Sequence, residues 1–113
     1  MIKILKYEDF VIGCQEIAIS VDKKLIKNIY GIPRGGLVLA VYLSHLLNIP
    51  IVDRPTGKET LIVDDIADTG TTLNDFKDYT IATLYYHKQS KVKPDIWIYE
   101  KKDNWILFPW ENE

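Results

Sequence analysis

The pattern of apolar residues predicts two helices in the first half of the chain. Between residues 7 and 21 they fall every three or four positions with charged residues between them, which predicts an amphipathic helix. Residues 37–47 are almost wholly apolar and predict a buried helix, which Asn48 and Pro50 end. Shorter apolar runs between turn-forming residues predict strands at 25–30, 49–52 and 79–85.

The run Leu61-Ile62-Val63 is apolar and β-branched, as in strands that a parallel sheet buries on both faces. A helix is expected after it, at about 71–77. This alternation predicts an α/β fold, a mostly parallel twisted sheet flanked by helices. After Pro94 the pattern changes to short strands rich in Trp and Tyr. We therefore expect a single domain, with a core at about 7–93 and a small C-terminal hood at about 94–113.

The length, net charge and cysteine content of the chain limit the kinds of partner and compartment that we expect. The 113 residues fit one domain, and a net charge of −2 argues against a large nucleic-acid-binding face. Cys14 is the single cysteine, so no internal disulfide can form, and we expect a buried thiol in a reducing compartment. Glu8 and Asp9 follow the start too soon for a signal peptide, and no apolar run reaches membrane-spanning length. These features predict a cytoplasmic protein that binds neither nucleic acid nor membrane.

The segment LIVDDIADTGTTL, residues 61–73, sets three aspartates before a turn of threonines and glycine. Ligands of open parallel sheets bind at the carboxyl ends of the strands, where these polar residues are expected. Backbone amides and the hydroxyls of Thr69, Thr71 and Thr72 suit a phosphate, and Gly70 permits its close approach. Neither a Walker A loop nor a GxGxxG motif is present.

The carboxylates beside this turn suit a different part of the same ligand. Carboxylates accept hydrogen bonds from the vicinal hydroxyls of a sugar, and they attract Mg²⁺. A sugar phosphate, which is both a diol and an anion, would account for the crowding of acids against an anion-binding turn. Asp64 and Asp65 are also candidate Mg²⁺ ligands, directly or through water. The simpler alternative is a strand-end loop whose acids only cap the next helix.

This order of apolar strand, two acids, two further residues and a Thr/Gly turn resembles the type I phosphoribosyltransferases. That family binds 5-phosphoribosyl-1-pyrophosphate with Mg²⁺ and transfers the ribose phosphate to a nitrogenous base, releasing pyrophosphate. The resemblance implies that Asp64 and Asp65 meet the ribose hydroxyls and that residues 68–72 hold the 5′-phosphate. It also implies that Asp68 is the catalytic residue, a general base that accepts a proton from the purine.

A second match is GIPRGG, residues 31–36, which follows the first predicted strand of the sheet. The family carries a small turn with Arg or Lys and glycines at this place, and its backbone amides bind pyrophosphate. The resemblance implies that Gly35 and Gly36 contribute amides and that Arg34 donates charge-assisted hydrogen bonds. A Gly-Pro turn with a solvated arginine is the alternative.

The tail DNWILFPWE looks like the hood of the xanthine-guanine phosphoribosyltransferases. The likeness implies that Trp105 stacks on the purine and that Ile106 reads its edge through the main chain. Stacking of a base on an aromatic side chain contributes about 1–3 kcal/mol. Trp97 and Trp110 are assigned to core packing, and Glu111 is a further candidate near the purine 2-substituent.

Purine-using members also carry a lysine, just after the strand that follows the phosphate turn, which donates to the 6-oxo group. Lys88 is the natural candidate here, and a one-residue change in register would put His87 in that place. The alternative is that Lys88 and His87 are simply exposed at the end of the strand and do not contact the purine.

The chain departs from the family between the second and third predicted strands. Most members carry a long flexible loop there, whereas residues 53–60 form only a tight turn, whose Arg54 and Lys58 could replace the loop electrostatically. The function predicted is purine phosphoribosyl transfer to xanthine, guanine or hypoxanthine by a homo-oligomer. The alternatives are a non-catalytic or regulatory module that binds phosphoribosyl pyrophosphate or a nucleotide, and an interaction domain without a ligand.

Overall fold

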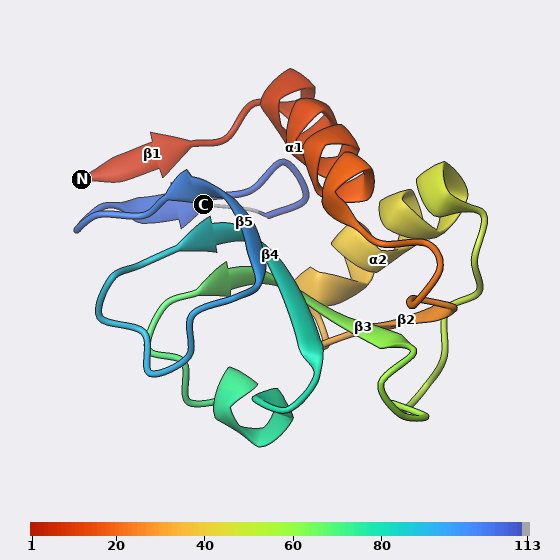
Figure 1. Ribbon diagram of the computed structural model, residues 1–113. Helices are drawn as coiled ribbons and strands as arrows, with labels where there is room; N and C mark the ends of the chain where they lie inside the picture. The colour runs from red at the N-terminus through yellow and green to blue at the C-terminus, as the bar shows by residue number, and fades with distance from the viewer. Residues whose placement is uncertain (112–113) are drawn as a thin grey trace.

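The computed structural model describes residues 1–111, so the last two residues of the predicted hood lie outside the described part. Its main feature is a parallel sheet of four strands in the order β2-β3-β4-β5 (Figure 1). The strands are β2 (Asn28–Gly31), β3 (Thr60–Ala67), β4 (Thr80–Tyr86) and β5 (Ile96–Glu100). The prediction of an α/β fold with a mostly parallel sheet is confirmed.

Two helices cover one face of this sheet, α1 (Tyr7–Ser20) and α2 (Gly35–Leu47). Side chains of β3 alternate between the faces, as a strand requires. Leu61 and Val63 pack in the core under the helices, whereas Ile62 packs on the other face with Leu73. Cys14 is fully buried in the helix-covered core, as expected. Because both faces bury apolar side chains, residues 61–63 of β3 form an unbroken apolar run.

A separate pair of parallel strands joins the two ends of the chain. The strand β1 (Ile2–Ile4), which the sequence pattern did not indicate, pairs with β6 (Trp105–Leu107). The register sets Ile2 opposite Trp105. The hood is also fixed by its own side chains, because Ile106 and Phe108 are buried in the same core as the two helices.

Three predicted elements are shorter than expected. The strand predicted at 25–30 begins only at Asn28, because Leu25 and Ile26 close a turn onto the carbonyl of Asp22. The strand predicted at 49–52 is reduced to one bridge between Ile51 and Ile29. The helix predicted at 71–77 is a single 3₁₀ turn, η1 (Leu73–Phe76). Its sequence offers Asn74 and Asp75, residue types that favour turns over helix interiors.

Two predictions of burial were also wrong. Trp97 is 36% exposed, because β5 is an edge strand whose side chains lie partly at the surface. The apolar helix is not buried all round, since Leu37 and Val41 of α2 are exposed. Within residues 1–111, no helix has the length and apolar character needed to cross a membrane.

Candidate active site

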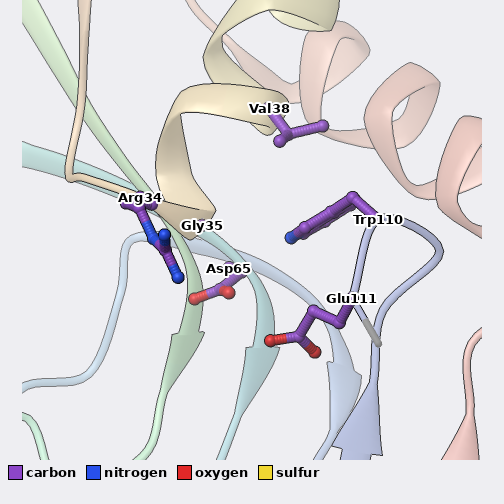
Figure 2. Close-up of a pocket in the computed structure, with 6 residues that line it drawn as sticks. All are labelled: Arg34, Gly35, Val38, Asp65, Trp110 and Glu111. Atoms are coloured by element: carbon purple, nitrogen blue, oxygen red, sulfur yellow. The ribbon is translucent and has the colours of Figure 1, made fainter. Parts of the chain in front are cut away.

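Two adjoining cavities lie where β3 approaches its carboxyl end. The first has a volume of about 660 Å³, within the range of small-molecule sites, and Figure 2 shows the side chains around it. It is lined by Arg34, Gly35, Val38, Asp65, Trp110 and Glu111. The second is about 190 Å³ and is lined by Asp65, Ile66, Asp68, Lys101, Trp105, Ile106, Phe108 and Glu111. Asp65 and Glu111 line both, so the two cavities are neighbours with a shared wall.

Glycines allow the turn after β2 to lie directly against β3. A Cβ on Gly35 would collide with the carboxylate of Asp65, and a Cβ on Gly36 would collide with the carbonyl of Val63. The turn is also held by a hydrogen bond of 2.9 Å from the Ile32 amide to the same carbonyl. Arg34 precedes α2 with its side chain exposed, and its guanidinium faces the first cavity (Figure 2). The GIPRGG segment and the acids of β3 therefore meet at one place.

Asp64 and Asp65 lie inside β3 rather than after it, since this strand continues to Ala67. The Asp65 amide donates to Asp64 Oδ1, and the Ile66 amide donates to Asp65 Oδ1, both at 2.8 Å. Burial, followed by the charge of Asp65, raises the pKa of Asp64 to about 8. Burial also raises the pKa of Asp65 above its ordinary value. Two crowded carboxylates with raised pKa values beside a cavity are typical of a functional site.

A divalent cation would find part of its ligand set here. Carboxylate oxygens are the ligands that Mg²⁺ prefers, and a nearby cation would offset the burial that disfavours their charged forms. Residues 1–111 hold no cluster of three or more histidine, cysteine, aspartate or glutamate side chains that could bind a metal. A cation beside Asp64 and Asp65 would therefore take its other ligands from a substrate or from water.

Asp68 lines the second cavity and has two polar neighbours. Gln89 Nε2 donates to Asp68 Oδ1 at 2.9 Å, and Lys101 Nζ lies 3.5 Å from Asp68 Oδ2. The Lys101 side chain is only 11% exposed. Its backbone amide donates to the Tyr86 carbonyl at 2.9 Å, which continues the pairing of β5 with β4 by one residue. The sequence analysis did not select Lys101, because one lysine in a charged turn carries no local signal.

The threonine turn follows Asp68 at the surface. Gly70 has a φ of +81°, and a Cβ there would lie 2.5 Å from Ser90 Oγ. The Thr71 amide donates to Thr69 Oγ1 at 3.3 Å, so the turn is closed by its own side chain. Thr69, Thr71 and Thr72 are exposed and do not line either cavity. The turn is next to the cavities along the chain, with its hydroxyls open to solvent.

Aromatic residues of the hood form the outer walls of both cavities. Trp105 is 66% exposed yet lines the second cavity, while the adjacent Ile106 is 4% exposed. Trp110 packs on Phe108 with ring centroids 4.9 Å apart and also lines the first cavity. Its assignment to the core was therefore incomplete, since it also faces the site.

The structure does not bring Lys88 to either cavity. Its side chain is 83% exposed, and its Nζ lies 3.6 Å from Glu100 Oε2. His87 is more buried, at 17% exposed, and its Nε2 lies 3.7 Å from Asp103 Oδ1. Both residues follow β4, and neither is among the residues that line the second cavity.

Residues 53–60 do not cover the site. Arg54 is 82% exposed and lies 3.7 Å from Asp53. Lys58 lines a different cavity with Thr80, at the amino end of β4 and so at the opposite edge of the sheet. The interpretation that these two cations replace the missing loop was therefore wrong for Lys58.

Comparison with known proteins identifies the family. No family model matches the chain. A xanthine-guanine phosphoribosyltransferase of Nitratidesulfovibrio vulgaris strain Hildenborough is 31% identical to it, over 81% of this chain and 73% of that protein. The chain belongs to the xanthine-guanine phosphoribosyltransferase family. A member from Desulfotalea psychrophila is 29% identical, over 81% of this chain and 74% of its own length.

Solved structures agree with this membership. The purine phosphoribosyltransferase of Pyrococcus horikoshii OT3 superposes with a TM-score of 0.86 at 28% identity, over 99% of this chain and 95% of that one. A xanthine-guanine-hypoxanthine phosphoribosyltransferase of Helicobacter pylori gives a TM-score of 0.84 over 98% and 94% of the two chains. Its 20% identity supports the fold alone. The type I phosphoribosyltransferase fold therefore holds over nearly the whole chain.

Proposed function

We propose that this protein is a purine phosphoribosyltransferase that moves the 5-phosphoribosyl group from 5-phosphoribosyl-1-pyrophosphate to xanthine, guanine or hypoxanthine and releases pyrophosphate. The observation that carries this proposal is the shared wall of Asp65 and Glu111 between the two cavities. A donor in the first cavity and a base in the second would meet at this wall, as a direct transfer between them requires.

The first cavity suits the donor. Arg34 offers a planar, charged hydrogen-bond donor to the diphosphate, and the glycine turn leaves room for a close approach. The ribose hydroxyls would donate to the carboxylates of Asp64 and Asp65. The 5′-phosphate would bind the turn formed by Thr69, Gly70, Thr71 and Thr72. Asp64 and Asp65 would hold Mg²⁺, which would supply charge neutralisation for the leaving pyrophosphate.

The second cavity suits the purine. Trp105 would stack on the ring, and the main chain of Ile106 would meet its edge. In the reaction, the bond between the anomeric carbon and the pyrophosphate oxygen breaks, and its electron pair leaves with pyrophosphate. A purine nitrogen forms the new bond to that carbon, and the ring proton passes to Asp68. Carboxylates beside the ribose favour the positive charge that develops there.

Nucleotide formation tests the proposal directly. The protein is mixed with Mg²⁺, the donor and each purine in turn, and the products are separated by chromatography. A nucleotide with at least one 6-oxopurine is expected. Asp68→Asn should lower kcat by about a hundredfold and leave the donor KM within about twofold, since a general base typically contributes 10²–10⁴-fold.

A matched control is Asp75→Asn, which changes an exposed acid in η1 outside both cavities and should leave the turnover unchanged. Donor binding without any nucleotide would contradict the transferase and favour a regulatory module instead. Equal losses of turnover and donor binding in Asp68→Asn would contradict its role as the base.

We also propose that the protein forms a homo-oligomer. Leu37 and Val41 are exposed on α2 four residues apart, so they share one face of that helix. Exposed apolar residues that lie together are typical of contacts between proteins. Light scattering should give at least twice the monomer mass, and Val41→Glu should reduce it. A monomer at every concentration would contradict the assembly.

A further inference from the structure

Lys101 has an unusual place for a lysine at the end of an edge strand. Its side chain is 11% exposed, and it lines the second cavity with Asp68, Trp105 and Ile106. Lysine is almost never buried unless its charge is paired, and here Nζ lies 3.5 Å from Asp68 Oδ2. Among the described residues that line this cavity, Lys101 is the one cation.

The ammonium of Lys101 has capacity for a further partner. A lysine carries three donors. One donates to the Lys102 carbonyl at 3.3 Å, and one faces Asp68. A third remains for a group that enters the cavity. Lys88, by contrast, pairs with Glu100 at the surface and is 83% exposed.

The pairing of this cation with Asp68 matches one edge of a 6-oxopurine. In guanine, N7 and the 6-oxo oxygen lie next to each other on the same edge. A carboxylate accepts a proton or a hydrogen bond from a ring N–H, and a neighbouring ammonium donates to the oxo group. In adenine the same edge carries an amino group, which offers hydrogen to a cation that can only donate.

We propose that Lys101 is the specificity-determining residue for the base, donating to the 6-oxo oxygen while Asp68 faces the adjacent ring nitrogen. This role rests on the proposed transferase function. The cation that contacts the base is then Lys101, which follows β5, and not Lys88, which follows β4. The enzyme then selects 6-oxopurines over adenine through the ion pair of Lys101 and Asp68, both of which line the second cavity.

The test compares Lys101→Met with Lys88→Met, and uses Lys102→Met as a control because Lys102 is exposed outside both cavities. Guanine is the substrate, and 2-aminopurine, which lacks the oxo group, is a competing inhibitor. Lys101→Met should raise the KM for guanine by about 10- to 100-fold, the usual effect of losing a hydrogen bond to a charged group. The inhibition constant of 2-aminopurine and the donor KM should both stay within about twofold.

Lys101→Arg keeps a cation, so it should retain more of the preference for guanine than Lys101→Met. Equal thermal stability of the two variants would exclude misfolding as the cause of the difference between their KM values. Equal losses for guanine and 2-aminopurine, or a loss in Lys88→Met with none in Lys101→Met, would overturn the proposal. If the wild-type protein forms no nucleotide, the transferase function fails by itself. Calorimetric binding of guanosine monophosphate would then still test Lys101, with weaker binding by Lys101→Met supporting its role and equal binding overturning it.

Discussion

Replacing Asp64 with asparagine should change how the stability of the protein depends on pH. Asp64 lies inside β3, and its carboxyl contacts Asp65. Burial and the charge of Asp65 raise the pKa of Asp64 from 3.8 to about 8. The neighbouring Glu111 carboxylate contributes in the same direction to the raised pKa of Asp65. The folded protein therefore holds a proton on this pair at pH values where the unfolded chain has released it.

The sign and size of the effect follow from proton linkage. Between about pH 4 and pH 8 the folded state binds more protons than the unfolded state, so the free energy of unfolding falls as the pH rises. One proton gives a slope of up to about 1.4 kcal/mol per pH unit. Asparagine cannot ionise, so Asp64→Asn removes this contribution. The stability of the variant relative to the wild-type protein should increase steadily from pH 5 to pH 8.

Urea unfolding at constant ionic strength, without Mg²⁺, measures this difference at each pH. Groups that do not interact with Asp64 titrate alike in both proteins and cancel in the difference, which therefore reports the interacting pair Asp64 and Asp65. Asp75→Asn, which changes an exposed acid, should give a curve parallel to that of the wild-type protein. A difference between Asp64→Asn and wild type that stays constant from pH 5 to pH 8 would refute the argument that the fold raises this pKa.

Three further outcomes test other parts of the site. Gly35→Ala places a methyl group against the Asp65 carboxylate, so the donor KM should rise by more than about tenfold while the base KM stays within about twofold in steady-state assays. Trp105→Ala should raise the base KM by about 5- to 150-fold, from about 1–3 kcal/mol of stacking, without lowering the melting temperature, because Trp105 is 66% exposed. Removal of divalent cations with a chelator should abolish nucleotide formation, and added Mg²⁺ should restore it. Full activity in the presence of the chelator would contradict a metal-dependent donor site.

The sheet and both long helices were predictable because their signals are local, a periodic pattern for α1 and continuous apolar runs for α2 and the central strand. The apolar residues of α1 recur at helical spacing, and Phe10, Cys14 and Ile17 are the ones that the structure buries. The length of β3 was not predictable in the same way. Asp64 and Asp65 disfavour a strand locally, yet pairing with β4 on one side continues the ladder through them. Tertiary pairing outweighed local preference at these two aspartates, of which Asp65 lines both cavities.

The parts of the site that the sequence did not reveal depend on contacts between distant segments. Lys101 faces Asp68 only because β5 pairs with β4 in a register that places residue 101 beside Tyr86. Trp110 faces the first cavity only because the hood folds back over α1 and packs on Phe10. Lys101 belongs to no local motif, and Trp110 lies in the DNWILFPWE run at a place to which the resemblance gave no role in the site, so each was left to the surface or the core.

The position of the wall that we propose binds the base depends on the first residues of the chain. β6 carries Trp105 and Ile106, and its described pairing partner is β1, opposite Ile2 and Lys3. Leu5 adds an amide hydrogen bond of 2.9 Å to the Leu107 carbonyl. The donor side, in contrast, is built from β2, β3 and the start of α2, which are held together by the central sheet. The two halves of the site are therefore supported by different strands, and the pairing of β1 with β6 supports the half that we propose binds the base.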